Sequence, residues 1–161
     1  MSDGDKDSAF NRAVKLLRYR ARSEAEVRKK LQQLGFSDTV TASTLKKLRD
    51  LKLLDDAAFA SNWALSRVEG QSYGPLRVDK ELQQKGIAQP IISQILDELF
   101  GQQQGKQKAR LLLEKKFGHK DLTEPKILRR AIVFLQRRGY RDSIIAAILP
   151  QSGGDDEMEG P

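Results

Sequence analysis

Apolar residues recur along this chain at the spacing of amphipathic helices, and a six-residue motif that appears three times sets their register. The motif reads LQQLGF at 31–36, LQQKGI at 82–87 and LQRRGY at 135–140. Apolar residues stand four and eight positions before each glycine: Leu31, Leu82 and Leu135, and Val27, Val78 and Ala131. Because residues four apart share one face of a helix, each motif is expected to end an amphipathic helix.

The glycines of this motif, Gly35, Gly86 and Gly139, lie 51 and 53 residues apart. A glycine just past a helix end commonly adopts the left-handed conformation, and the apolar residue after it folds back onto the last turn. Apolar residues also keep fixed offsets of five and ten positions after the glycines: Val40, Ile91 and Ile144, and Leu45, Leu96 and Leu149. Fixed offsets over such a length predict a tandem repeat.

Each repeat is predicted to hold three helices. Good helix formers dominate the sequence, and β-branched residues nowhere alternate as they would in a strand, so the fold class is all-α. Ser23 with Glu26 forms a capping box that opens one helix. Gly70 is expected to end another, and Pro75 and Pro125 suit the first turn of a helix.

These signals divide the chain into three repeats between two tails. The repeats are expected at 9–54, 55–100 and 101–150, with a disordered N-terminal tail at 1–8 and a disordered acidic C-terminal tail at 151–161. Both tails are polar, contain glycine and carry acidic residues, a composition typical of disorder. A three-helix unit of about 50 residues is marginally stable alone, so neighbouring repeats are expected to bury surface against one another.

Charge is distributed unevenly among the repeats. The 161-residue chain has a formal net charge of +7, but 9–54 and 101–150 each hold twelve Lys/Arg against four Asp/Glu. Residues 55–100 instead hold four Lys/Arg against seven Asp/Glu, so an acidic repeat lies between two basic ones. Solvated surfaces that differ by chance are the plain alternative. We favour a polyanionic partner, with nucleic acid, bare or already coated by protein, as the obvious candidate.

The composition excludes several classes of site. No cysteine is present, so disulfides, thiol nucleophiles and thiolate metal sites are excluded. The sequence contains neither a signal-like segment nor an apolar span long enough to cross a bilayer, so we expect a cytoplasmic protein without membrane contact. The sole histidine, His119, lies in an apparent turn, which is more typical of a surface loop than of a general base.

Other residues that suggest chemistry have structural interpretations. Asp55 and Asp56 fall at a helix start, where carboxylates cap free backbone amides. Trp63 and Phe59 are four residues apart, and this pair is more typical of a core than of a base-stacking platform. We therefore predict a binding protein rather than an enzyme, with no cofactor and no metal.

The sequence resembles a known family in its central stretches LLDDAAFASNWALSR (53–67) and YGPLRVDKELQQKGI (73–87). Together with SEAEVRKKLQQLGF before them, and KKFG and FLQRRGY after them, they resemble the RecX family of bacterial recombinase regulators. The resemblance covers residues 9–149 and implies tandem three-helix repeats in an elongated, curved array. It also implies binding in the groove of the RecA–DNA filament and inhibition of the RecA ATPase, recombinase and coprotease activities. Such inhibition would modulate DNA repair and the SOS response.

The resemblance further implies that the protein has no catalytic centre and needs no cofactor. It also implies that the partner is RecA, mainly as a filament on single-stranded DNA. Direct contact with DNA is a further option, and we expect the chain to be a monomer. Candidate filament-binding residues come from the two basic repeats and from the YGP turn of the middle one: Arg18, Arg20, Arg22, Arg28, Lys29, Arg67, Tyr73, Arg77, Lys115, Lys116, Arg129, Arg130, Arg137 and Arg138. The role of the acidic tail is open.

A direct DNA-binding protein is the competing hypothesis, because three-helix units with basic residues also describe helix-turn-helix modules. Against it, no predicted helix carries a compact set of Arg, Asn and Gln that stands out as a base-reading face. A helical adaptor unrelated to DNA is favoured only by the acidic middle repeat.

Overall fold

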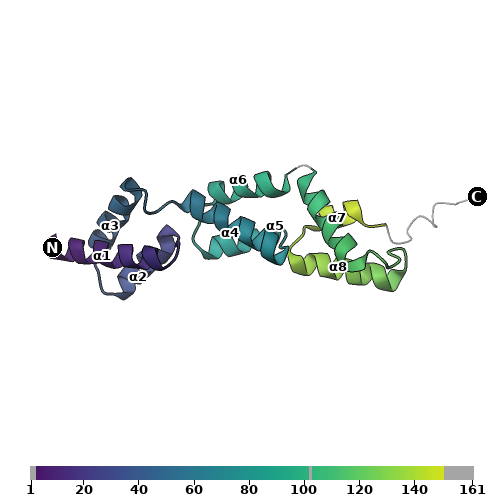
Figure 1. Cartoon of the computed structure of the whole chain (residues 1–161), viewed down its shortest axis with the longest axis horizontal. Helices are drawn as coiled ribbons and strands as arrows, with labels where there is room; N and C mark the ends of the chain where they lie inside the picture. The colour runs from purple at the N-terminus through teal and green to yellow at the C-terminus, as the bar shows by residue number, and fades with distance from the viewer. Residues whose placement is uncertain (1–2, 102, 151–161) are drawn as a thin grey trace, which may run out of the picture. The chain divides into compact units, whose positions relative to one another are not determined.

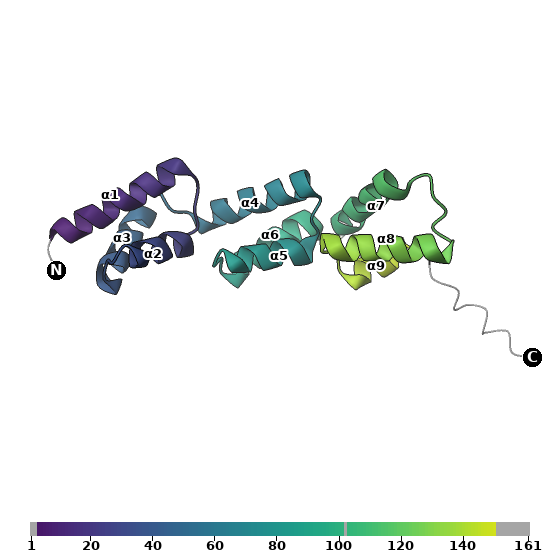
Figure 2. The ribbon, with the colours of Figure 1, turned by 90° about the horizontal axis from the view of Figure 1, so that it is seen from below.

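The computed structural model of the chain describes residues 3–101 and 103–150, which form nine α-helices and no strands. The all-α prediction is therefore confirmed for this part of the chain. The helices are α1 (Asp3–Tyr19), α2 (Glu24–Gln33), α3 (Asp38–Asp50), α4 (Asp56–Gln71), α5 (Pro75–Gln84), α6 (Gln89–Phe100), α7 (Gln104–Phe117), α8 (Pro125–Arg138) and α9 (Asp142–Ile148). In Figure 1 and Figure 2, α1, α2 and α3 form one bundle, and α7, α8 and α9 form another.

The chain divides into two compact units. The first comprises the described residues up to Leu65 together with Glu81–Ser93, and the second comprises Ser66–Lys80 together with the described residues from Gln94 onward. The division therefore runs through α4, α5 and α6, each of which contributes residues to both units. The elongated, curved array that the family resemblance implies stays a prediction.

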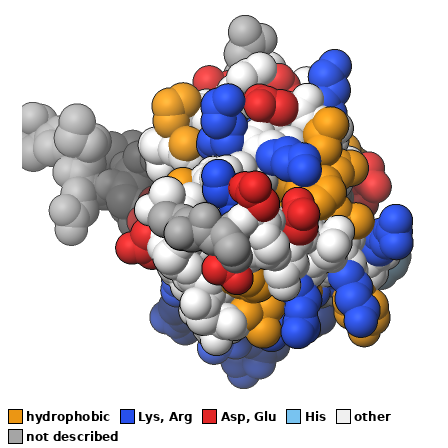
Figure 3. Space-filling model, turned by 90° about the vertical axis from the view of Figure 1, so that its left-hand side faces the viewer, with side chains coloured by type: hydrophobic (Ala, Val, Ile, Leu, Met, Phe, Trp, Pro, Cys, Tyr) orange, Lys and Arg blue, Asp and Glu red, His pale blue; other side chains and the backbone are white. Residues whose placement is uncertain are grey.

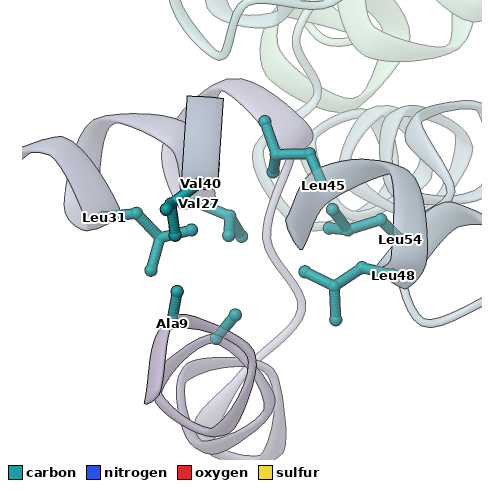
Figure 4. Close-up of a cluster of buried hydrophobic side chains, with 8 residues drawn as sticks. Ala9, Val27, Leu31, Val40, Leu45, Leu48 and Leu54 are labelled. Atoms are coloured by element: carbon teal, nitrogen blue, oxygen red, sulfur yellow. The ribbon is translucent and has the colours of Figure 1, made fainter. Parts of the chain in front are cut away.

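In the first unit, α1, α2 and α3 bury their apolar faces against one another, and Figure 4 shows side chains from these elements meeting in one cluster. The buried members are Ala9, Ala13, Val27, Leu31, Val40, Leu45, Leu48 and Leu54. Full burial of one Val or Leu side chain stabilises a fold by about 1.5–3 kcal/mol, so this cluster holds the bundle together. The predicted capping box is confirmed, because Ser23 and Glu26 each accept the other's backbone N–H.

All three motif glycines end their helices in the same way. The backbone is left-handed at each, with φ angles of 91° at Gly35, 76° at Gly86 and 93° at Gly139. In each case the N–H of the following apolar residue donates to the carbonyl of the motif leucine: Phe36 to Leu31 at 3.2 Å, Ile87 to Leu82 at 3.1 Å and Tyr140 to Leu135 at 3.0 Å. This is the bond pattern of a Schellman helix end, and it confirms the predicted helix stops.

The N-terminus of α2 docks on the C-terminal end of α5 within the first unit. The Ser23 hydroxyl donates to the backbone carbonyl of Lys85 at 2.6 Å, and Lys85 Nζ lies 3.6 Å from Glu26 Oε2. A Cβ atom at Gly86 would overlap the Cβ of Ala25, so this glycine is needed for close packing as well as for its left-handed φ. We call this contact between the first and middle repeats the first seam.

The N-terminus of α5 docks on the C-terminal end of α8 within the second unit. The N–H of Gly74 donates to the carbonyl of Arg138 at 2.6 Å, and the N–H of Leu76 donates to the carbonyl of Gly139 at 2.9 Å. A Cβ atom at Gly74 would lie 2.7 Å from the carbonyl carbon of Gly139, which leaves no room for a side chain. We call this contact between the middle and third repeats the second seam. It repeats the geometry of the first seam, because the N-terminus of one repeat's middle helix again meets the glycine that follows the middle helix of the next repeat.

Helices α7, α8 and α9 pack around a separate core in the second unit. Its buried apolar residues include Ala109, Leu113, Phe117, Leu128, Ala131, Leu135, Ile145 and Leu149. Two edge-to-face aromatic pairs extend it, with ring centroids 5.6 Å apart for Phe117 and Phe134 and 6.1 Å apart for Phe100 and Tyr140. Burial raises the pKa of Tyr140 to about 12, so its hydroxyl stays protonated at neutral pH.

The N-terminal boundary differs from the sequence prediction. Helix α1 begins at Asp3, so residues 3–8 are helical rather than part of a disordered tail. Asp3 and Asp5 lie in the first turn, where carboxylates interact favourably with the positive end of the helix dipole, and this offsets the polar composition of the segment. The tail predicted at 151–161 lies outside the described residues. Within the described residues, no helix is both long and apolar enough to cross a bilayer.

The end of α4 also differs from the prediction. The sequence places it at Gly70, but α4 continues to Gln71 and the chain turns at Ser72, which has a φ of 58°. The N–H of Tyr73 then donates to the carbonyl of Arg67 at 3.3 Å, so a serine occupies the left-handed position that was expected of the glycine.

Candidate polyanion-binding surface

In the first repeat, several cations are paired with acidic side chains of α2. Arg20 lies 2.8 Å from Glu26, and both Arg28 and Arg49 contact Glu24, at 3.4 and 2.8 Å. Exposed ion pairs of this kind stabilise a fold by less than about 1 kcal/mol. These pairs nevertheless neutralise part of the positive charge of the first repeat, which was expected to bind a polyanionic partner. Arg20 and Arg28 are therefore weaker candidates for partner binding than their exposure suggests.

Glu26 lies at the centre of these contacts and of the first seam. Burial disfavours its ionised form, but hydrogen bonds from the Arg20 side chain and the Ser23 backbone, together with the charges of Lys85 and Arg20, outweigh this effect. The pKa of Glu26 is consequently lowered below its usual value of 4.5. Glu26 is thus ionised at neutral pH and holds two cations in place.

Helices α1 and α2 border a surface hollow of about 610 Å³ in the first unit. We call it the basic hollow, and its lining residues are Arg12, Lys15, Leu16, Arg18, Tyr19, Arg22, Lys30 and Leu34. Five of the eight are cations and none is acidic. Arg22 is fixed at its edge, because the side-chain Nε donates to the carbonyl of Leu16 at 3.3 Å.

The basic hollow collects cations that lack internal partners. Over residues 3–101 and 103–150, no ion pair involves Arg12, Lys15, Arg18 or Lys30. Sequence reasoning singled out Arg18 and Arg22 as candidates but missed the other three cations. The spacing of Arg12, Lys15 and Tyr19 places these three side chains along one stripe of α1 and could have indicated Arg12 and Lys15, whereas Lys30 lies on α2.

The face of the molecule that Figure 3 draws is a mixture of side-chain types. Figure 3 shows lysine and arginine side chains next to hydrophobic ones, with acidic side chains between some of them. Net charge alone therefore describes this surface poorly. What matters for a polyanion is where unpaired cations gather, and among the residues described in the first repeat they gather around the basic hollow.

In the middle repeat, the candidates of the YGP turn make contacts inside the chain. The guanidinium carbon of Arg77 lies 4.1 Å from the ring centroid of Tyr73, and Arg77 Nη1 donates to the carbonyl of Arg137 at 3.3 Å. Arg67 contributes its carbonyl to the end of α4. Arg77 and Tyr73 therefore support the second seam, and a role for them in binding a partner stays a prediction.

In the third repeat, the candidates divide between the second seam and the open surface. Arg138 belongs to the seam, since its Nη1 donates to the carbonyl of Gln71 at 2.7 Å and its guanidinium lies 5.4 Å from the Phe134 ring centroid. Lys116 also contacts this ring, with its Nζ 5.9 Å from the Phe134 ring centroid. The remaining candidates are exposed: Lys115, Arg129, Arg130 and Arg137.

Residues that could suggest catalysis are accounted for by local structure. Asp55 accepts the N–H of Ala58 at 3.0 Å, which confirms it as the cap of α4. Asp56 instead accepts the N–H of Glu24, at the start of α2, at 2.8 Å. Phe59 is buried and stacks on Trp63 with centroids 5.9 Å apart, as expected of a core pair. In the described part of the chain, no group of acidic and histidine side chains is arranged to hold a metal ion.

Family comparisons match the three repeats one by one. The models described as the first, second and third three-helix domains of RecX match residues 9–48, 55–96 and 103–149. In the described residues, helices α1 to α3, α4 to α6 and α7 to α9 overlap these three ranges in turn.

Comparisons with single proteins agree. The chain is 34% identical over 157 residues to "Regulatory protein RecX" of Bacillus velezensis, covering 96% of this chain and 60% of that protein. It is 30% identical over 164 residues to the protein of the same name from Chlorobaculum tepidum, covering 99% of this chain and all of that protein. The chain thus spans about three fifths of the length of the Bacillus relative.

The fold is also similar to a solved structure. The crystal structure of RecX from Lactobacillus salivarius superposes with a TM-score of 0.79 at 23% identity, covering 91% of this chain and 96% of that one. At this identity the likeness concerns the fold alone.

Proposed function

Because the chain belongs to the RecX family of regulatory proteins, we propose that it binds in the groove of the RecA–DNA filament and inhibits RecA. The proposed inhibition extends to the ATPase, recombinase and coprotease activities, and thereby modulates DNA repair and the SOS response. In this proposal, the partner is RecA, mainly as a filament on single-stranded DNA. The protein itself is a cytoplasmic monomer that acts without catalysis of its own.

The observation that carries this proposal is the separation of paired from unpaired cations. The first repeat presents unpaired cations around the basic hollow, and the third presents an exposed set that includes Arg129 and Arg130. Between them in the sequence lies a repeat with four Lys/Arg against seven Asp/Glu. A filament offers both phosphates and charged protein walls, so two basic repeats and an acidic one can each find a complementary surface.

Repetition of similar units also supports binding to a repeating partner. A filament presents the same subunit surface many times, so each repeat can contact a different subunit with modest affinity. Linking three such contacts in one chain raises the total affinity far above that of each contact alone. This arrangement requires no deep pocket and no bound cofactor.

The test is the rate of ATP hydrolysis by RecA on single-stranded DNA with the protein at substoichiometric amounts. We expect hydrolysis to slow, and the protein alone to hydrolyse no ATP. Replacing Arg129 and Arg130 by glutamine should weaken this inhibition, because it removes two unpaired cations from the third repeat. A control that replaces Lys6 and Lys46 by glutamine removes the same charge from exposed positions elsewhere and should inhibit like the wild type.

Two results would contradict the proposal. Full RecA ATPase activity at saturating protein would exclude inhibition. Naked duplex DNA bound as tightly as the filament at physiological salt would favour the competing hypothesis of a direct DNA-binding protein.

A further inference from the structure

Tyr19 differs from the other aromatic residues that the structure describes. Its side chain is 84% exposed, and within the described residues it takes part in no ring stacking, cation–π contact or hydrophobic cluster. The other aromatic side chains all have such contacts: Phe10, Phe36, Phe59, Trp63, Tyr73, Phe100, Phe117, Phe134 and Tyr140. Because the other aromatic side chains all have contacts within the fold, the exposed ring of Tyr19 indicates a contact with a partner molecule.

The surroundings of Tyr19 indicate the chemistry of that partner. Tyr19 is the only aromatic among the described lining residues of the basic hollow, which also include five cations and no carboxylate. Leu16 and Leu34 supply the remaining apolar surface. A ligand for this hollow must therefore combine several negative charges with a flat or apolar group.

We propose that the basic hollow binds single-stranded nucleic acid, with one base stacked on the ring of Tyr19 and the flanking phosphates paired with Lys15, Arg18 and Lys30. An unpaired base presents the π-face that an exposed ring can stack on, and the phosphates on either side supply the negative charge. The inference rests on the proposed function, because it assigns one contact of the filament-bound protein to the DNA strand itself.

An acidic protein segment fits the hollow less well. A docked amphipathic helix needs several apolar anchors spaced over two turns, whereas only three of the eight lining residues are apolar or aromatic. One of these is Tyr19 itself. Intact duplex DNA is also disfavoured, because its bases are stacked inside the helix and cannot reach the tyrosine ring. The hollow should therefore distinguish single strands from duplexes.

The first experiment measures binding of a fluorescent oligothymidine of about 15 nucleotides to the full chain by anisotropy, without recombinase. Tyr19→Ala should weaken binding by about tenfold, because it removes the stacking surface. Tyr19→Phe keeps the ring and should bind within about twofold of the wild type, since stacking needs only the ring. Because the side chain is exposed, both variants should retain wild-type helicity and thermal midpoints.

The second experiment tests the cations of the hollow by salt dependence. Changing Lys15 and Lys30 to glutamine should weaken binding and lower the slope of log K against log salt by about 1.4, the value for two lost phosphate contacts on a single strand. The control with Lys6 and Lys46 changed to glutamine removes the same charge away from the hollow. Its slope should stay close to that of the wild type.

Three outcomes would overturn the inference. Tyr19→Ala could bind oligothymidine as tightly as the wild type, or an abasic oligonucleotide of the same length could bind as tightly as oligothymidine. A peptide of glutamate and leucine could instead bind in a Tyr19-dependent manner while oligothymidine does not, which would assign the hollow to an acidic protein segment.

The failures of this inference and of the proposed function are distinguishable. If the wild type inhibits the RecA ATPase while oligothymidine binding ignores Tyr19, the assignment of the hollow is wrong and the proposed function stands. If oligothymidine binding depends on Tyr19 while the ATPase is unaffected at saturating protein, the hollow stands and RecA inhibition is wrong.

Discussion

Substituting alanine at Gly35 and at Gly86 separates two roles that glycine has in this fold. Both residues follow a middle helix in the same motif, and both have a left-handed backbone, with φ of 91° and 76°. Placing an alanine in that conformation costs roughly 1–2 kcal/mol at either position. Only Gly86 lies in the first seam, since a Cβ at Gly35 would meet nothing within 4 Å.

The second contribution is therefore confined to Gly86→Ala. The new Cβ would overlap the Cβ of Ala25, and the start of α2 would have to move away from α5. Overpacking of this kind costs about 1–3 kcal/mol. We expect Gly35→Ala to lower the free energy of unfolding by about 1–2 kcal/mol and Gly86→Ala to lower it by about 2–5 kcal/mol.

Urea denaturation followed by far-UV circular dichroism and tryptophan fluorescence measures both effects. The chain has a single tryptophan, Trp63, whose ring centroid is 4.6 Å from Lys85 Nζ, so its fluorescence reports on the first seam. The double variant Ala25→Gly, Gly86→Ala removes one of the two overlapping atoms and should recover the excess cost. Equal destabilisation by the two single variants, or strict additivity in the double variant, would refute the overlap as the cause.

Three further predictions concern side chains at the seams. Ser23→Ala removes both the cap of α2 and the bond to the Lys85 carbonyl, so it should lower the free energy of unfolding by about 1–2 kcal/mol in a urea titration. Folding lowers the pKa of Glu26, so the stability that it contributes is present above its usual pKa of 4.5 and is lost as the pH falls through the folded value. Glu26→Gln should accordingly flatten the acid limb of the stability–pH curve, and an unchanged limb would contradict the assignment. Arg138→Ala should destabilise by about 1 kcal/mol through loss of the Gln71 bond, whereas exposed Arg129→Ala should leave the thermal midpoint unchanged.

The sequence was sufficient for features that depend on local physics. Gly35, Gly86 and Gly139 could be placed past helix ends because a left-handed residue, a buried leucine and a following apolar residue form one short pattern. The capping box of Ser23 and Glu26 was predictable for the same reason, since both partners lie within one helical turn.

Contacts between distant residues could not be predicted in this way. Ser23 and Lys85 are 62 residues apart, and nothing in either local pattern shows that the serine hydroxyl donates beyond its own helix. Arg77 was chosen as a partner contact because it is a cation beside a turn, yet its hydrogen bond to Arg137 spans 60 residues. The charge and sequence position of an arginine cannot show whether its side chain bonds within a seam or is available to bind a ligand.

The candidate surface was predicted in part. Arg18 and Arg22 were selected by charge alone, but the basic hollow also contains Lys30 of α2, and only the packing of α1 on α2 brings it there. Tyr19 was overlooked because an aromatic residue near the end of an amphipathic helix is usually part of the core. Its exposure depends on where α1 ends relative to α2.

The second seam has an evolutionary consequence. Two of its hydrogen bonds join main-chain groups of Gly74, Leu76, Arg138 and Gly139, so this part of the junction depends on backbone shape and not on side-chain identity. A duplicated gene segment would have to keep two features to join its neighbour: a glycine after its middle helix, and a small residue, as at Gly74 and Ala25, at the start of the facing helix. Gly35 has the same left-handed backbone, but a Cβ built there would meet nothing within 4 Å, so among the described residues this glycine ends its helix without also serving as a docking site.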